Sequence, residues 1–215
     1  IAVAILVFGV KEPPPVPKEQ RVPIKAAEIA RLGRFYWFVV GAGAVFTLAR
    51  FSEAFLVIRA HDAGLALALA PAVIAVMSVV FAAAAYPAGR LQDRFGARPL
   101  LIAGLVALIA ADVLLARGQS LTAIFLGIAL WGLNMGLTQG VLSALAAQAA
   151  PSRLRGTAVG LFVLVTGLAA LVASVLAGVL WETIGPATTF FAGAGFAGLS
   201  LVACLGIHRR MGAAG

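Results

Sequence analysis

The sequence predicts an all-α integral membrane protein: a six-helix transmembrane bundle, preceded by the end of a truncated span. Hydrophobic residues make up 62% of the 215 residues and charged residues only 11%, with a mean hydropathy of +1.06. Soluble domains contain about 45–50% apolar and about 25% charged residues, so a bilayer must cover part of this apolar surface. The apolar runs show no alternation of polarity, which excludes a barrel and leaves helices as the spanning elements.

The chain opens with ten apolar residues, 1–10, about half of the roughly 20 that a helix needs to cross a bilayer. We interpret them as the end of a truncated transmembrane helix, which would make the chain a fragment. Residues 11–34 form a proline-rich polar segment, interpreted as a cytoplasmic linker. Its second half, 24–32, is either a short amphipathic helix at the interface or part of a solvated linker.

Six apolar segments follow and form the predicted bundle, residues 35–207, ahead of a short cytoplasmic tail, 208–215. Each segment is bounded by charged or turn-forming residues. The predicted spans are 35–58, 65–88, 100–116, 121–147, 157–180 and 187–207.

The basic residues are distributed unequally between the two sides of the predicted bundle. Thirteen of the 16 Lys and Arg residues fall on the side of the linker, while only Arg59 and Arg117 fall on the other and Arg50 lies inside a span. The positive-inside rule therefore places the linker and the tail in the cytoplasm, as in a bacterial inner (plasma) membrane. The net charge of +8 is spread over short clusters, so it does not indicate a nucleic-acid partner.

The segment 89–98, GRLQDRFGAR, is charged and separates two long apolar runs. Three arginines and an aspartate are not tolerated in hydrocarbon, so the segment is predicted to be a tight loop at the membrane surface. Glycines at its start and near its end permit tight backbone turns. At the least, it is a basic loop that sets orientation. The positions that define its pattern are Gly89, Asp93, Arg94, Gly96 and Arg98.

This pattern resembles the loop signature of the major facilitator superfamily of secondary transporters, with Ala97 where a basic residue is common. Residues 151–158 and 181–186 resemble the turns before the eleventh and twelfth helices of that family. The resemblance implies the C-terminal half of a twelve-helix major facilitator fold, alternating access between two six-helix halves, and a conformational role for the loop. It also implies that Asp93 meets a helix of an N-terminal half that this chain lacks.

Arg50 and Glu53 lie inside the first predicted span, on one helical face with Thr47. Charges at such depth are costly, so both are expected to face the bundle interior or a watery cavity. One interpretation makes Glu53 a proton-coupling group and Arg50 its partner or an anion site. The other is a static ion pair that locks two helices.

The fourth span carries Trp131, Asn134 and Thr138 within about 60° on a helical wheel. This stripe is predicted to line a cavity and hydrogen-bond a solute. The alternative is that Asn134 and Gln139 only bond neighbouring helices. On the roughly opposite face, glycines recur at every fourth position, a spacing that suits close helix packing. These glycines are Gly132, Gly136 and Gly140.

Other polar residues in the spans carry weaker predictions. Asp112 comes late in the third span, and we expect it to be solvated near the outer interface. Thr166 and Ser174 are expected only to bond their own helix backbone.

The function that these observations favour is secondary-active transport of a small-molecule substrate across the lipid bilayer, by an antiporter or symporter that uses a proton or other ion gradient. The alternatives are a membrane scaffold or receptor without transport, and a membrane enzyme. An enzyme needs convergent reactive groups, and the sequence offers scattered single charges. We therefore expect no catalytic residues, no metal site and no cofactor.

Overall fold

The computed structural model describes residues 32–211, apart from a few side chains near the end of the last helix. The predicted truncated helix, nearly all of the predicted linker and the last residues of the tail lie outside the described residues. The chain divides into two units, and residues 33–215 form the second of them.

Within the described residues the regular elements are all helical, as predicted. Five predicted spans each contain one long helix, and the first is divided between two. The helices are α3 (Arg34–Leu48), α4 (Ala54–Asp62), α5 (Ala70–Phe95), α6 (Ala97–Arg117), α7 (Leu121–Gln148), α8 (Arg155–Thr183) and α9 (Pro186–Met211), with 3-10 turns η2 (Leu67–Leu69) and η3 (Ser152–Leu154).

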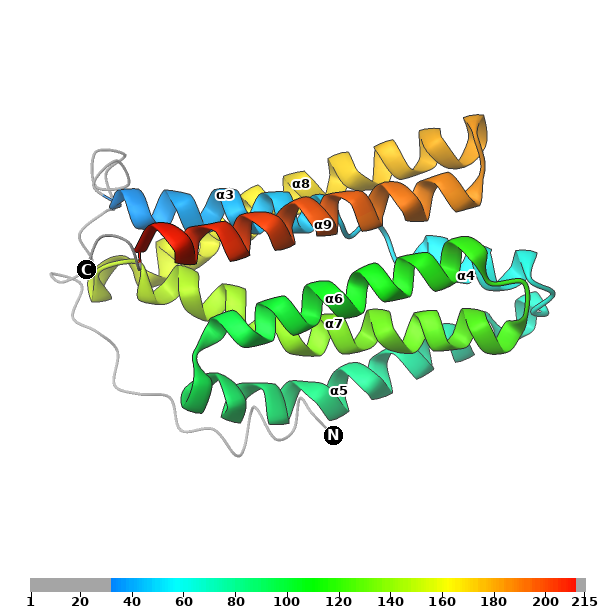
Figure 1. Cartoon of the computed structure of the whole chain (residues 1–215), viewed down its shortest axis with the longest axis horizontal. Helices are drawn as coiled ribbons and strands as arrows, with labels where there is room; N and C mark the ends of the chain where they lie inside the picture. Colours follow the sequence, from blue (N-terminus) through cyan, green and yellow to red (C-terminus); the bar gives the residue numbers. More distant parts are fainter. Residues whose placement is uncertain (1–31, 212–215) are drawn as a thin grey trace, which may run out of the picture. The chain divides into compact units, whose positions relative to one another are not determined.

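The helices pack in two groups of neighbours. Helices α5, α6 and α7 lie against one another, and α3, α8 and α9 do the same (Figure 1). Contacts of α6 with α9 and of α7 with α8 join the groups. Within the second group, the buried hydroxyl of Tyr36 donates a hydrogen bond to the carbonyl of Ala158 at 2.8 Å, which ties α3 to α8.

The outer surfaces of the bundle are apolar. Four helical segments of residues 32–211 (67–95, 97–117, 121–148 and 152–183) are long and apolar enough to cross a membrane. Only 11% of the most apolar stretch is buried in the first and last of these, against 44% in the middle two. A water-soluble fold buries its most apolar helices, because exposing them to water is unfavourable. The observed pattern fits a bundle whose outer helices contact lipid.

Close approach of α5 and α7 depends on two of the three predicted glycines. A Cβ atom at Gly136 would lie 2.6 Å from the Cβ of Ala84, and one at Gly132 would collide with the main chain of Met77. At Gly140 nothing lies within 4 Å of such an atom. The packing role predicted from the glycine spacing is confirmed at Gly132 and Gly136 and does not extend to Gly140.

The predicted loop at residues 89–98 is mostly helical. Helix α5 continues through Phe95, and α6 begins at Ala97. The prediction of a turn at Gly89 was therefore wrong, since that residue is part of α5. The reversal takes place at Gly96, whose φ of +80° lies in the region that favours glycine. Gly96 is the single residue between the end of α5 at Phe95 and the start of α6 at Ala97.

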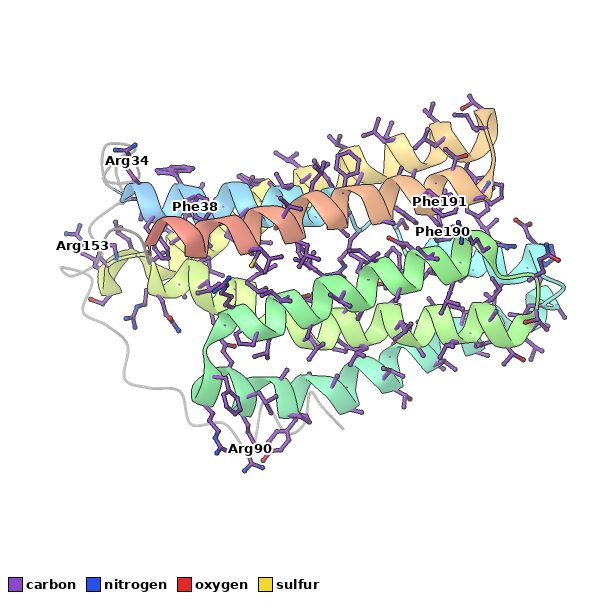
Figure 2. All side chains as sticks on the ribbon, viewed as in Figure 1. Arg34, Phe38, Arg90, Arg153, Phe190 and Phe191 are labelled. Carbon is purple, nitrogen blue, oxygen red and sulfur yellow. The ribbon has the colours of Figure 1, made fainter. Side chains whose placement is uncertain are left out.

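Three described basic residues that were predicted to share one side of the membrane lie at one end of the bundle. Figure 2 shows Arg34, Arg90 and Arg153 at the end opposite the α8–α9 turn. These residues come from the start of α3, the last part of α5 and the turn before α8. Their common end agrees with the side to which the sequence assigned them, and the positive-inside rule predicts that this end is cytoplasmic.

Candidate functional site

The first predicted span is interrupted in its middle. Helix α3 ends at Leu48 and α4 begins at Ala54, so residues 49–53 are not helical. The expectation that Arg50 and Glu53 share one face of a continuous helix was therefore wrong. The segment contains neither proline nor glycine, so its sequence does not predict a break in the helix.

Tertiary contacts account for this interruption. The Phe51 ring packs against Trp131 of α7 and Phe190 of α9, with ring centroids 5.3 and 5.5 Å apart. The main-chain N–H of Ser52 donates to Ser174 Oγ of α8 at 3.1 Å, and its own hydroxyl accepts from the N–H of Ala54 at 3.3 Å. Partners outside the helix thus satisfy main-chain groups that the break frees, the condition for irregular backbone within a membrane.

A pocket of about 560 Å³ opens beside this break. Three elements line it: the end of α3 with the break, the middle of α7, and the middle of α8. The first contributes Phe46, Thr47, Arg50, Phe51, Ser52 and Glu53; α7 contributes Trp131, Gln139, Leu142 and Ser143; and α8 contributes Phe162, Val163, Thr166, Gly167, Ala170 and Ser174.

Arg50 and Glu53 are the two charged residues of this pocket. Both side chains are half-buried. The Nε atom of Arg50 is buried and has no hydrogen-bond partner in the described part of the chain, and Glu53 is its electrostatic neighbour. A buried guanidinium N–H without a partner is unusual in a folded protein and marks this arginine as a candidate functional group.

The stripe predicted on α7 is divided between two surfaces. Trp131 lines the pocket, but Asn134 and Thr138 are fully buried and are not among the residues that line it. Asn134 donates to the carbonyl of Gly104 of α6 at 2.8 Å, and a Cβ atom at Gly104 would collide with the methyl group of Thr138. Asn134 thus bonds a neighbouring helix, as the alternative interpretation had it, whereas Gln139 lines the pocket. Thr138 packs against α6 and donates its hydroxyl to the carbonyl of Asn134 in its own helix.

Sequence reasoning missed several polar residues of the pocket. Thr166 and Ser174 do donate to main-chain carbonyls of their own helix, at 2.8 Å each, as expected, yet both also line the pocket. Residues 162, 166, 170 and 174 recur at every fourth position and so form one face of α8. This spacing of four residues could have indicated from the sequence that they share one face of the helix. The other residues missed are Ser52, Gln139 and Ser143.

The residues of the charged segment lie at the basic end of the bundle. Gly89, Asp93 and Arg94 are exposed in the last turns of α5, and Arg94 stacks over the Phe95 ring at 5.2 Å. Arg98, at the start of α6, is an electrostatic neighbour of the Cys204 thiol of α9. The segment thus presents an exposed charged face on α5 and an internal contact between α6 and α9.

Asp112 was expected to be solvated, and this expectation was wrong. Its side chain is 0% exposed, because α9 and the break between α3 and α4 cover that part of α6. Hydropathy alone does not reveal which face of a helix its neighbours cover.

Comparisons with known proteins agree with this architecture. Residues 38–212 match the Major Facilitator Superfamily. An uncharacterised MFS-type transporter of Methanocaldococcus jannaschii is 30% identical over 195 residues, which are 88% of this chain and 48% of that protein. The chain therefore spans about half the length of the relative that it matches. With its membrane-spanning helices, these matches identify the chain as an integral, multi-pass membrane protein that belongs to the Major Facilitator Superfamily.

Proposed function

We propose that this chain forms one half of a proton-coupled secondary transporter that moves a small polar solute by alternating access. In this proposal a second six-helix half faces the pocket and completes the binding site. The protein works as an antiporter or symporter in the plasma membrane, which in a bacterium is the inner membrane. The observation that carries the proposal is the pocket at the break between α3 and α4, with Arg50 and Glu53 in it.

Three properties of this pocket support transport. Its charged groups lie where a helix is discontinuous, and secondary transporters bind substrates and coupling ions at such places. Intramembrane charges are costly, which makes them functional candidates by default. The neighbouring side chains supply hydroxyl and amide groups for a polar solute. In the proposed site Thr47 and Trp131 complete the wall, while Asn134 and Thr138 keep α7 in register with α6.

The charged segment at 89–98 has a separate role in the proposal. Asp93 and Arg94, exposed at the basic end of α5, contact the second half when the transporter is closed on that side. Gly96 provides the turn and Arg98 anchors α6 to α9. This contact sets the balance between conformations and takes no part in solute binding.

Alternating access predicts that Gly167→Cys is labelled by a membrane-impermeant thiol reagent from either face of the membrane. Gly167 lines the pocket and has nothing within 4 Å of a Cβ atom, so the new side chain fits. The measurement uses the full-length protein in liposomes, with its other cysteines, Cys204 included, replaced by alanine. Leu168→Cys is the control, because that residue is 57% exposed on the apolar side of α8 and its thiol in lipid should label from neither face. Labelling of Gly167→Cys from one face only, under all conditions, would instead support a scaffold or receptor.

Asp93→Asn is expected to change the ratio of inward to outward labelling of Gly167→Cys severalfold, because it removes the charge that contacts the second half. In transport assays, turnover should fall while substrate affinity changes little. Glu182→Gln is the matched control, since Glu182 is also an exposed carboxylate but lies in the last turn of α8. Weakened solute binding with a normal labelling ratio in Asp93→Asn would contradict a switching role.

A further inference from the structure

Asp112 is a buried acid without a partner. Both of its carboxyl oxygens are buried and lack a hydrogen-bond partner within the described residues, and the side chain is 0% exposed. An ionised carboxylate in such surroundings is strongly unfavourable. It persists only where a cation or hydrogen-bond donors offset that cost.

The charged groups around Asp112 are engaged elsewhere or lie on other surfaces. Arg59 of α4 donates its Nε–H to the carbonyl of Leu115 at 2.8 Å and also bonds the carbonyl of Gly118. Arg117 stacks over the Phe191 ring at 5.7 Å, and Arg50 and Glu53 line the pocket.

The helices packed on α6 add no cation beside Asp112. Helix α7 carries no charged residue, α9 carries none among its described side chains, and the charged residues of α5 lie in its last turns at the opposite end. Since nothing among the described residues neutralises the carboxylate, the neutral acid is the form that fits this site.

Three groups converge on Gly193 of α9. A Cβ atom there would lie 2.8 Å from Asp112 Oδ2, 3.2 Å from Phe51 Cε1 and 3.4 Å from the carbonyl oxygen of Ala49. The absence of a side chain at Gly193 leaves room for the acid beside the ring. Phe51 also lines the pocket, so one residue both borders the pocket and packs at Gly193 next to the acid.

We propose that Asp112 is a proton-binding site distinct from Glu53, which carries a proton in this conformation and exchanges it with water of the pocket when Phe51 moves aside. The proton leaves the carboxyl group for a water molecule and returns from one, and no other bond changes. As a second proton site of a transport cycle, this inference rests on the proposed function. The presence of the proton and its shielding by Phe51 are measurable separately.

Infrared spectroscopy of the full-length protein in liposomes at neutral pH tests the first part. A carbonyl stretching band of a protonated carboxylic acid is expected, and it should be lost in Asp112→Asn and kept in Glu53→Gln. Labelling the unmutated protein with aspartate carrying ¹³C in its side-chain carboxyl should shift the same band, which covers the case of a variant that fails to fold. A spectrum in which Asp112→Asn and isotopic labelling leave no difference would overturn the proposal.

Transfer into D₂O tests the second part, the shielding by Phe51. The deuterium shift of the Asp112 band should be slow in the unmutated protein and at least tenfold faster in Phe51→Ala. Phe55→Ala is the control, because Phe55 packs against Phe51 and Trp181 but does not line the pocket. Equal exchange in the two variants would contradict the gating role. Since the band does not depend on labelling at Gly167, failure of alternating access and failure of this inference are distinguishable.

Discussion

Glu53→Gln is expected to remove most of the pH dependence from the inward-to-outward labelling ratio of the full-length transporter. In the proposed mechanism the Glu53 carboxylate in the pocket binds the coupled proton, and glutamine mimics its neutral form permanently. Proton-driven transport should therefore be lost while exchange of solute continues. Any pH dependence that is left should disappear when Asp112→Asn is added, because Asp112 is the second proposed proton site.

Arg50→Ala is the partner variant for this experiment. Arg50 acts electrostatically on Glu53, and a nearby cation favours the charged form of a carboxylate. Its removal takes away the cation next to Glu53, so the labelling ratio should depend on pH differently from that of the unmutated protein. A static ion pair predicts otherwise: both variants would reduce the folded yield, and the surviving protein would keep its normal pH profile.

Gly132→Ala is expected to lower the folded yield and the apparent Tm of the full-length protein. Alanine in a helix is favoured over glycine by roughly 0.5–1 kcal/mol, whereas overpacking a fitted interface costs about 1–3 kcal/mol. At Gly132 the new methyl group would meet main-chain atoms of Met77. A main chain cannot turn aside as a side chain does, so the packing term outweighs the propensity term.

Gly140→Ala provides the matched control on the same helix. It has the same spacing and the same propensity gain, but no atom lies within 4 Å of the added Cβ. Its apparent Tm should equal or exceed that of the unmutated protein, measured by thermal unfolding in detergent. Equal losses in both variants would show that the α5–α7 contact does not set the stability of the bundle.

Most of the fold is predictable because the bilayer imposes simple local rules. Apolar runs of about 20 residues bounded by charge predict the spans, and the helices α5 to α9 were each anticipated in this way. The break at residues 49–53 was not, because its cause is a contact of Phe51 with Trp131 and Phe190. Those partners are far away in sequence, and no proline or glycine marks the place.

The candidate site was predicted in part. Arg50 and Glu53 were identifiable because any charge inside an apolar span is conspicuous. Asn134 and Thr138 were assigned to a cavity because a helical wheel shows which residues share a face and does not show what that face meets. The structure turns that face toward Gly104 of α6.

The sequence by itself determined the class of the protein and the helices α5 to α9, because hydropathy acts through the membrane on each segment separately. Only the tertiary structure decided the break between α3 and α4, the pocket that Ser174 shares with Arg50, and the burial of Asp112. Each of these depends on which helix faces meet, and that outcome is set by packing between segments distant in the chain.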